Sequence, residues 1–325
     1  MRCHAIRFHE TGGPEKLTWE ETEVGEPGPG QLLLRQTAIG LNYIDTYHRT
    51  GLYPVPLPSG IGLEAAAGVE KTGPGVTEFK VGDRVAYASA PIGAYAEWRL
   101  YPAERAVKLP EGISDRQGAA MMLQGMTVEY LIRRTFPVKA WQVVLFHAAA
   151  GGVGLIACQW LKHLGATVIG TAGSPQKMEL AKAHGCAHVI DYRQEDVAKR
   201  VRELTDGKGV PVVYDGVGKD TFQASLDSLA PRGMFVSFGN ASGPVPPFEP
   251  VILSAKGSLY FTRPSLVAYV AARAELLESA KALFDVVRSG AVKIEVRQTY
   301  PLKEAAQAQR DLEARKTTGS TLLLP

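Results

Sequence analysis

A glycine-rich turn between an apolar run and a helical pattern is the first stretch able to do chemistry. Residues 143–146 form an apolar run that begins with two β-branched valines, and apolar residues then recur at helical spacing until Gly165 stops the pattern. Between them lies Ala149-x-Gly151-x-x-Gly154, a dinucleotide fingerprint with alanine at its first position. Gly151 lets the backbone approach a pyrophosphate, to which the helix N-terminus offers free N–H groups. An ordinary turn of small residues would show the same pattern. The strand and helix units that follow therefore have to show whether a dinucleotide-binding fold is present.

The residues about twenty positions beyond the fingerprint indicate which dinucleotide would bind. NAD-binding folds place an acidic side chain there to bind the ribose 2′-hydroxyl, whereas residues 169–174 contain no acid. Ser174, Lys177 and, after the next strand, Tyr192 supply hydroxyls and a cation that suit a 2′-phosphate. The alternative is that Ser174 is only a helix N-cap and Lys177 only a solvated residue, although one serine can do both. We expect NADP(H) rather than NAD(H).

From residue 141 onward, strand and helix patterns alternate. The expected strands are residues 143–146, 167–171, 188–190, 211–214, 234–238 and 258–261. One expected helix starts at Ser174-Pro175 and stops at Gly185, and two more cover residues 196–204 and 221–229. Strands joined by helices in this way predict a doubly wound parallel sheet of the Rossmann type, because right-handed crossovers leave few other topologies.

The flanking parts of the chain have a different pattern. Residues 1–110 are punctuated by Gly and Pro, and strands expected at 31–39, 81–87 and 93–100 indicate an antiparallel, barrel-like β domain. A helix from Ser114 to about Arg134 would lead into the next domain. A helix over residues 274–288 and short strands up to Pro325 belong to the first domain again. We expect domains of residues 1–124 with 265–325, and of residues 125–264, with the chemistry in the cleft between them.

Length, charge and cysteine content limit the class of protein. A chain of 325 residues can build two domains with full cores. The net charge of +3 is too small to favour nucleic acid or a membrane as the main partner. No apolar run reaches transmembrane length, and the first residues show no signal-peptide pattern. Cys3, Cys158 and Cys186 lack metal-type spacing and indicate reduced thiols in a cytoplasmic protein.

Several motifs together resemble the medium-chain dehydrogenase/reductase superfamily, and within it the NADPH:quinone oxidoreductases of the zeta-crystallin type. The resemblance extends over the whole chain and rests on AIGLNYIDTY (38–47), GIGLEAAA (60–67), VGDRV (81–85), FHAAAGGVG (146–154), VSFGN (236–240) and TRP (262–264). It implies a GroES-like β-barrel domain with an inserted Rossmann domain, a homodimer, and hydride transfer from NADPH to a quinone. One departure is Ala67, beside Gly68, where the family pattern has glycine.

The same superfamily contains zinc alcohol dehydrogenases, whose metal ligands can be sought at the matching positions. The resemblance places their catalytic zinc on a cysteine near Asn42, a histidine after Gly62 and a further cysteine before the coenzyme domain. This chain has Asn42 and Leu63 at the first two positions, and no cysteine lies between positions 3 and 158. Zinc needs thiolate and imidazole ligands, so we expect no metal and no alcohol oxidation.

The resemblance also implies which residues form the two binding sites. On the acceptor side they are Asn42, Asp45, Tyr47, Tyr53 and Arg263. Around the coenzyme they are Asn42, Thr46, Tyr130, Gly151, Gly152, Val153, Gly173, Ser174, Lys177, Tyr192, Val217, Phe238, Gly239, Asn240, Ser242 and Arg315. Tyrosine rings can stack on a flat quinone and an amide can bond its carbonyl, although half-buried packing would also explain both tyrosines. Asp45 is expected to orient its neighbours, and His147 to be packed rather than a general base.

Three functions remain open at this point. The first is an NADPH-dependent quinone reductase, in which the protein mainly positions the reactants because the cofactor carries the chemistry. The second is a reductase of an activated C=C bond, such as an enal or enoyl thioester, on the same fold. The third is a non-enzymatic role as a lens structural protein or RNA binder, for which the basic cluster over residues 99–105 is thin. Turnover with a quinone or with an enone would separate the first two.

Overall fold

The computed structural model describes all 325 residues, which form two compact units. The β-rich unit comprises Met1–Met126, Val270–Arg288 and Ile294–Pro325. The parallel-sheet unit comprises Thr127–Tyr269 and Ser289–Lys293, and is therefore inserted into the β-rich unit. Its boundaries lie a few residues from the expected positions 125 and 264, apart from the short second segment.

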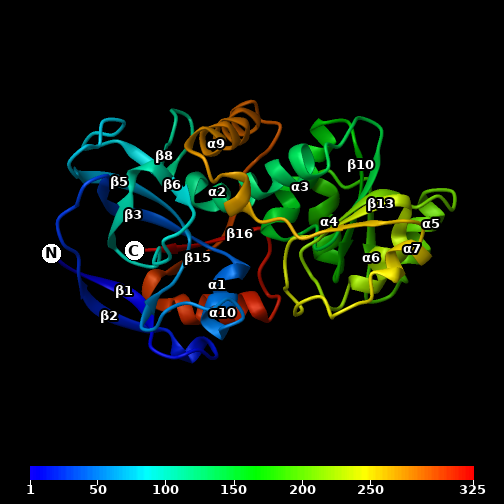
Figure 1. Ribbon diagram of the computed structural model, residues 1–325, viewed down its shortest axis with the longest axis horizontal. Helices are drawn as coiled ribbons and strands as arrows, with labels where there is room; N and C mark the ends of the chain where they lie inside the picture. The colour runs from blue at the N-terminus through cyan, green and yellow to red at the C-terminus, as the bar shows by residue number, and fades with distance from the viewer. The chain divides into compact units, whose positions relative to one another are not determined.

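A six-stranded parallel sheet forms the centre of the parallel-sheet unit (Figure 1), in the order β11-β10-β9-β12-β13-β14. Its strands are β9 (Val143–Phe146), β10 (Thr167–Ala172), β11 (His188–Asp191), β12 (Val210–Asp215), β13 (Leu229–Ser237) and β14 (Tyr260–Thr262). The predicted Rossmann sheet is confirmed. The order reverses between β9 and β12, and open sheets of this kind bind ligands at the carboxyl ends of the strands beside such a point.

Two of the helices of this unit begin at a side-chain cap that the sequence supplies. The helices of the unit are α3 (Gly152–His163), α4 (Pro175–Ala183), α5 (Val197–Leu204), α6 (Phe222–Ser228), α7 (Val251–Ala255) and α8 (Leu266–Tyr269). Ser174 caps α4 with Pro175 in the first turn, and Asp196 caps α5 by accepting the Lys199 N–H. Apolar side chains of strands and helices then close one core that includes Leu145, Ile169, Val213, Phe222 and Phe235.

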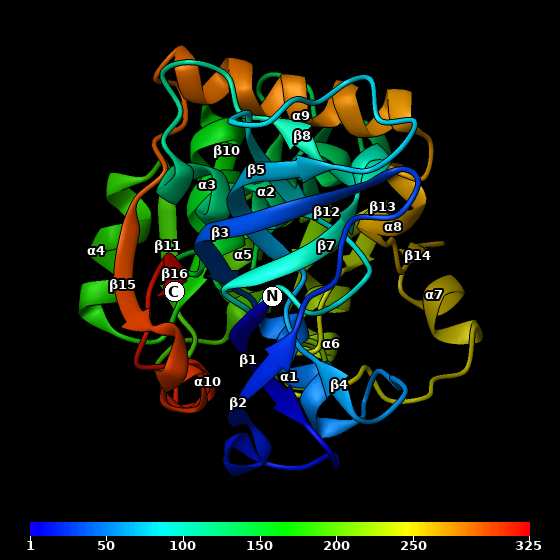
Figure 2. The ribbon, with the colours of Figure 1, turned by 90° about the vertical axis from the view of Figure 1, so that its left-hand side faces the viewer.

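The β-rich unit is built around β3 (Gln31–Leu41), which Figure 2 shows beside β5 (Glu64–Thr72) and β7 (Trp98–Pro102). The larger sheet has the order β15-β16-β3-β5-β6-β8, with β7 paired to β3. Its other strands are β6 (Arg84–Ala88), β8 (Val107–Lys108), β15 (Val296–Pro301) and β16 (Ser320–Leu324). A second sheet has the order β2-β1-β4, formed by β1 (Arg2–Phe8), β2 (Thr18–Glu23) and β4 (Ser59–Gly60). Since β16 pairs antiparallel with β3, the tail returns to the unit that the N-terminal residues begin.

The helices of the β-rich unit are α1 (Tyr43–Thr50), α9 (Arg273–Arg288), α10 (Ala305–Glu313) and most of α2 (Asp115–Tyr130). The helix expected from Ser114 to Arg134 is α2 followed by a π-helical turn, Leu131–Thr135. Short 3₁₀ turns occupy Pro14–Lys16, Ala103–Arg105 and Leu302–Glu304. None of the helices combines the length and apolar character needed to cross a bilayer.

The strand expected at residues 93–100 is wrong in its first half. Gly93 adopts a φ of 119°, which turns the chain out of a strand conformation. The Ala94 and Tyr95 N–H groups then bond the carbonyls of Gly62 and Ile61 instead of a ladder partner. Only Trp98–Pro102 forms a regular strand. The longer strand was predicted from alternating apolar residues, and the same alternation also occurs in a buried loop.

Candidate coenzyme and acceptor sites

The glycine-rich turn leads from β9 into α3 as a pyrophosphate site requires. Helix α3 starts at Gly152 with Gly151 as its N-cap, and no side chain caps this end. A Cβ at Gly154 would collide with carbonyl oxygens of the preceding turn, so glycine is needed for the helix to lie this close. The first N–H groups of α3, those of Gly152 and Val153 among them, have no side-chain cap and fit a pyrophosphate.

The residues expected to bind a 2′-phosphate lie beyond the carboxyl ends of β10 and β11, which pair in parallel. Ser174 accepts the Lys177 N–H at 3.3 Å, so this serine is indeed an N-cap. The Tyr192 phenol lies against Gly173, where a Cβ would collide with it. Tyr192 is 40% exposed and Lys177 is half-buried, so both can meet a ligand from solvent. A hydroxyl, a phenol and an ammonium thus come from one edge of the sheet, with no acid in residues 169–174, and fit an anionic 2′-phosphate.

The loops after β12 and β13 are held together by their backbones. Ser242 donates both its N–H and its hydroxyl to the Val217 carbonyl, at 2.8 and 2.9 Å. Gly239 packs on Gly216 so closely that a Cβ would collide with the Gly216 backbone. Five residues expected around the coenzyme therefore share one edge of the sheet: Val217, Phe238, Gly239, Asn240 and Ser242.

Tyr130 and Arg263 lie in the same unit, away from the glycine-rich turn in sequence. The Tyr130 ring stacks on Tyr269, with ring centroids 4.5 Å apart. Burial raises the pKa of the Tyr130 phenol well above its usual range, so the phenol stays neutral. Arg263 donates from Nη1 to the Ser237 carbonyl at 3.0 Å, at the carboxyl end of β13. Arg263 is thus anchored at the edge that carries Phe238 and Gly239.

The residues expected on the acceptor side include a group of aromatic rings on and just after α1. Tyr47 and Tyr53 meet edge to face, with centroids 5.3 Å apart, and the Tyr43 ring lies 5.9 Å from that of Tyr47. Tyr47 is buried and Tyr53 half-buried, and the Tyr53 N–H donates to the Tyr47 carbonyl at 3.0 Å. This packing agrees with both interpretations of the two tyrosines, as a stacking surface for a quinone and as ordinary half-buried aromatic packing. A stacking surface must itself be held in place by neighbouring side chains.

Asp45 is fully buried at the start of α1 and faces its own neighbours. Its Oδ2 accepts the Asn42 N–H at 2.9 Å and the Tyr95 hydroxyl at 2.7 Å. Burial raises the pKa of this carboxyl to about 7, with the two hydrogen bonds acting in the opposite direction. Thr46, also buried, donates its hydroxyl to the Tyr43 carbonyl at 2.7 Å. Asp45 therefore lies where a residue that orients the start of α1 should lie.

Arg315 belongs to the β-rich unit, just past α10. It adopts a left-handed φ of 58°, and its charge acts on the Tyr43 phenol, whose pKa burial raises. The candidate residues are therefore divided between the units. The β-rich unit holds Asn42, Asp45, Thr46, Tyr47, Tyr53 and Arg315, and the parallel-sheet unit holds the others.

Comparison with known proteins decides the family. Residues 28–111 match the alcohol dehydrogenase GroES-like domain, and residues 152–283 match the zinc-binding dehydrogenase domain. A quinone oxidoreductase of Pseudomonas aeruginosa is 55% identical over 98% of this chain and 99% of its own length. The chain belongs to the quinone oxidoreductase family. It is a zinc-free branch of the medium-chain dehydrogenase/reductase superfamily.

Two further relatives of this family bear on function. The crystal structure of Escherichia coli quinone oxidoreductase complexed with NADPH matches with a TM-score of 0.98 and 51% identity, covering 99% of this chain and 100% of that one. A 2-haloacrylate reductase of a Burkholderia species is also 51% identical, over 99% of this chain and 98% of its own length. Relatives with these two names are thus about equally similar to this chain.

Despite the description of the matched domain, the chain offers no set of metal ligands. No group of three or more His, Cys, Asp or Glu side chains is placed to hold a metal ion. Asn42, at the position where the resemblance expects a zinc-ligating cysteine, is instead engaged by two neighbours. It donates from Nδ2 to Glu64 at 2.6 Å and accepts from Gln124 at 3.2 Å.

Glu64 and Gln124 were not predicted from the sequence as parts of the site. Glu64 is fully buried, and its Oε1 accepts the Leu123 N–H of α2 at 2.8 Å. Burial raises the pKa of Glu64 to about 8. A signal was present, because Glu64 is the single charged residue in the otherwise small and apolar run of residues 60–67. Its meaning depends on Asn42 and α2, which are distant in the sequence.

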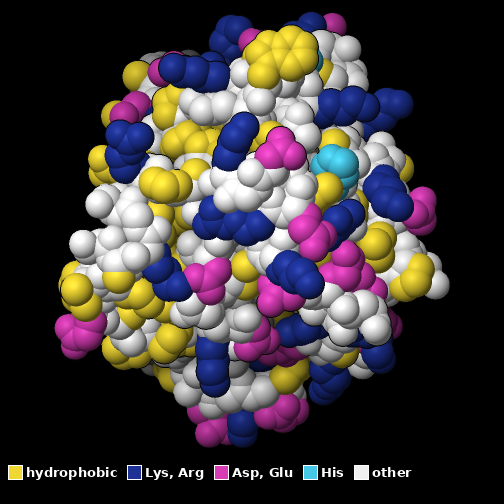
Figure 3. All heavy atoms as spheres, turned by 90° about the vertical axis from the view of Figure 1, so that its right-hand side faces the viewer, with side chains coloured by type: hydrophobic (Ala, Val, Ile, Leu, Met, Phe, Trp, Pro, Cys, Tyr) yellow, Lys and Arg dark blue, Asp and Glu magenta, His cyan; other side chains and the backbone are white.

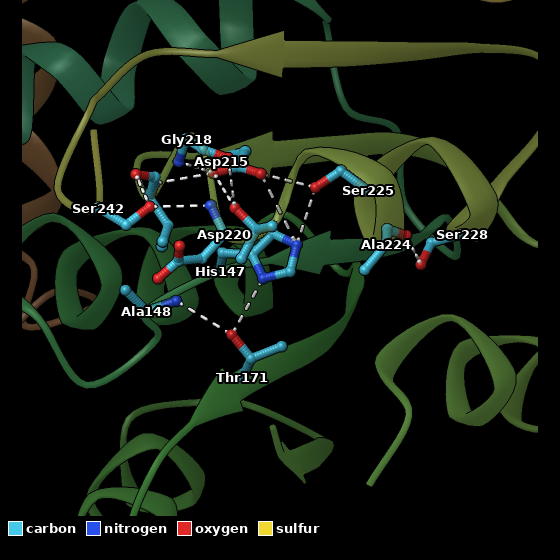
Figure 4. Close-up of polar contacts among 12 residues, drawn as sticks. His147, Ala148, Thr171, Asp215, Gly218, Asp220, Ala224, Ser225, Ser228 and Ser242 are labelled. Carbon is cyan, nitrogen blue, oxygen red and sulfur yellow. Dashed lines mark hydrogen bonds and ion pairs between the residues drawn. The ribbon is translucent and has the colours of Figure 1, made fainter. Parts of the chain in front are cut away.

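A second buried polar network was also missed, apart from its histidine. His147 is packed, as expected, and contacts Ser225 and Thr171 (Figure 4). Asp215, at the end of β12, accepts the Ser225 hydroxyl at 2.6 Å. All four side chains are essentially inaccessible to solvent.

Proposed function

We propose that the chain is an NADPH-dependent quinone reductase that uses no metal. The observation that carries this proposal is the edge of the parallel sheet, where an uncapped helix N-terminus adjoins an acid-free corner of hydroxyls and an ammonium. The 51% identical Escherichia coli enzyme, whose structure holds NADPH, supports the same reading. NADPH supplies a hydride when it is bound.

The chain's own residues would bind and orient this coenzyme. The N–H groups of Gly152 and Val153 would face the pyrophosphate, and Gly151 would let the backbone approach it. Gly173, Ser174, Lys177 and Tyr192 would surround the 2′-phosphate. The residues that line the rest of the coenzyme are Asn42, Thr46, Tyr130, Val217, Phe238, Gly239, Asn240, Ser242 and Arg315. The packed loops after β12 and β13 make this edge suited to positioning, which lowers the entropic part of the barrier.

On the acceptor side, we assign Tyr47 and Tyr53 to the face of a flat quinone and Asn42 and Arg263 to its oxygen atoms. Tyr47 and Tyr53 are already packed edge to face, so the wall they form needs little ordering when a ring arrives. The nearby carboxyl group of Asp45 holds the start of α1. The protein's work is then positioning and exclusion of water, and solvent can supply the proton.

A second candidate is reduction of an activated C=C bond. It is favoured by the 2-haloacrylate reductase that is 51% identical to this chain. Both reactions use the same coenzyme site and differ in what the acceptor site holds. A panel of quinones beside 2-haloacrylates and enones, followed by NADPH absorbance, separates them. Faster turnover, as kcat/KM, with a haloacrylate than with every quinone would overturn the first assignment.

Two further assignments go with this function. We propose a homodimer formed through an edge of the parallel sheet and a cytoplasmic location, and light scattering with size-exclusion chromatography measures the former. On the face in Figure 3, Lys and Arg side chains are interspersed with Asp and Glu, so this face offers no continuous basic patch for RNA.

A further inference from the structure

A network of four buried side chains, those of Thr171, His147, Ser225 and Asp215, joins the carboxyl ends of three strands in the parallel-sheet unit (Figure 4). Thr171 of β10 lies 3.2 Å from His147, which follows β9, measured from Oγ1 to Nδ1. The Nε2 atom of the same ring lies 3.0 Å from the hydroxyl of Ser225 on α6. Ser225 in turn donates to Oδ2 of Asp215, the last residue of β12.

The partners determine where each proton lies. Because the Ser225 hydroxyl donates to Asp215, it must accept from His147, so Nε2 of the ring carries the proton. Burial lowers the pKa of His147, which keeps the ring neutral and leaves Nδ1 as an acceptor. The Thr171 hydroxyl therefore donates to Nδ1. Every hydroxyl or ring N–H donor of the network then points the same way, toward the carboxylate of Asp215.

Both ends of this network accept backbone N–H groups at the edge of the sheet where the coenzyme is expected to bind. At one end, Thr171 Oγ1 accepts the Ala148 N–H at 3.2 Å. At the other, Asp215 Oδ1 accepts the N–H groups of Val217 and Gly218 at 2.8 and 3.0 Å. The network thus connects the turn that leads to the fingerprint with the loop after β12.

Ala148 has a backbone conformation that needs such support. Its φ is 53°, in the left-handed region that residues with a Cβ rarely adopt. Its carbonyl accepts the Gly151 N–H at 2.9 Å, so this conformation shapes the turn itself. Strained residues of this kind persist where the surrounding structure holds them.

A serine, a histidine and an aspartate in contact also suggest a hydrolase, but the arrangement is different. Here the serine lies between the other two and gives its proton to the aspartate, whereas a nucleophilic serine must give its proton to the histidine. The exposed fractions of Ser225 and His147 are 0% and 1%, so no substrate reaches them.

We propose that Thr171 and His147 are positioning residues that hold Ala148 in its left-handed conformation and so keep the fingerprint turn in the form that binds NADPH. The inference rests on the proposed coenzyme. It differs from a purely structural role because it predicts that the effect of losing the Thr171 hydroxyl disappears when residue 148 becomes glycine, which adopts this φ without strain.

The test uses the full-length protein with Thr171→Val, Thr171→Ser, Ala148→Gly and the double variant Thr171→Val/Ala148→Gly. NADPH dissociation constants come from fluorescence titration, and unfolding midpoints from thermal denaturation. We expect Thr171→Val to weaken NADPH binding by about 10-fold, in line with loss of one buried hydrogen bond. Thr171→Ser, which keeps the hydroxyl, should bind like wild type. The double variant should recover most of the lost affinity.

Thr205→Val is the matched control. The Thr205 hydroxyl also accepts a backbone N–H, from Gly209 at 2.9 Å, but it lies before β12, at the amino end of the strand. It should lower the unfolding midpoint and leave NADPH affinity unchanged. Should Thr171→Val fail to fold, Ser225→Ala interrupts the same network and should weaken NADPH binding, again with rescue by Ala148→Gly.

The outcomes separate the two levels of inference. If wild type does not bind NADPH, the proposed function fails. If wild type binds it and Thr171→Val binds equally well, or Ala148→Gly gives no rescue, the positioning role of the network is refuted while the proposed function stands.

Discussion

Tyr47 is the residue at which positioning and proton donation can be told apart. Its ring is buried against Tyr43 and Tyr53, so Tyr47→Phe keeps the packed ring and removes only the hydroxyl. We expect Tyr47→Phe to lower kcat/KM modestly and Tyr47→Ala to lower it clearly more, measured with one quinone at saturating NADPH. Proton donation typically contributes 10²–10⁴-fold. An equally large loss in both variants would contradict the positioning account.

Lys177 tests the choice of coenzyme at the same scale. Lys177→Glu places a carboxylate where a 2′-phosphate is expected, and should raise the KM for NADPH relative to that for NADH by the equivalent of about 1–3 kcal/mol. Lys182→Glu makes the same charge change near the other end of α4, where Lys182 pairs with Glu179 at 2.9 Å, and should not alter the preference. If the wild-type protein uses NADH as efficiently as NADPH, the assignment of this corner is wrong.

At the scale of elements, Glu64 joins three of them, since it lies on β5, accepts from Asn42 at the N-cap of α1 and accepts from Leu123 in the middle of α2. Burial raises the pKa of Glu64 from 4.5 to about 8, and that of Asp45 from 3.8 to about 7. Between these values the folded state binds more protons than the unfolded chain does. Both groups therefore favour folding most below their unfolded pKa values of 3.8 and 4.5, and this contribution is lost progressively as pH rises from there through about 7 for Asp45 and about 8 for Glu64.

The corresponding measurement is the free energy of urea unfolding between about pH 5 and pH 8. The wild-type value should decline as pH rises, by at most about 1.4 kcal/mol per pH unit for each such group. Glu64→Gln cannot ionise, so the decline should be shallower in this variant. An identical pH slope in both proteins would show that Glu64 is not held protonated by burial.

At the scale of the whole molecule, the expected property is the lack of a bound metal. No three His, Cys, Asp or Glu side chains come together in either unit, and the amide of Asn42 is bound to Glu64 and Gln124. We expect elemental analysis to find well under one zinc per chain after dialysis against a chelator, with activity retained. Stoichiometric zinc that survives the chelator would contradict this.

The parallel-sheet unit could be predicted from the amino-acid sequence because the signals for it are local. The strand predicted at residues 143–146 coincides with β9, and Ser174 and Asp196 cap helices where short-range hydrogen bonds allow it. The need for glycine in the fingerprint is local too, because a Cβ at Gly154 would collide with carbonyl oxygens of the turn just before it. The absence of an acidic residue directly after β10, which favours NADP(H), could likewise be seen in the sequence.

Which polar groups are buried together could not be predicted from the sequence, because it depends on how distant segments pack. Glu64 meets Asn42, and His147 meets Ser225, across long stretches of sequence, so no spacing rule could pair them. The raised pKa of Glu64 follows from desolvation, which depends on how β5 and α2 pack around it. The same holds for residues 93–97, where alternating apolar residues suit both a strand and a buried loop. There the hydrogen bonds to Gly62 and Ile61 select the loop, because partners rather than pattern satisfy a buried backbone.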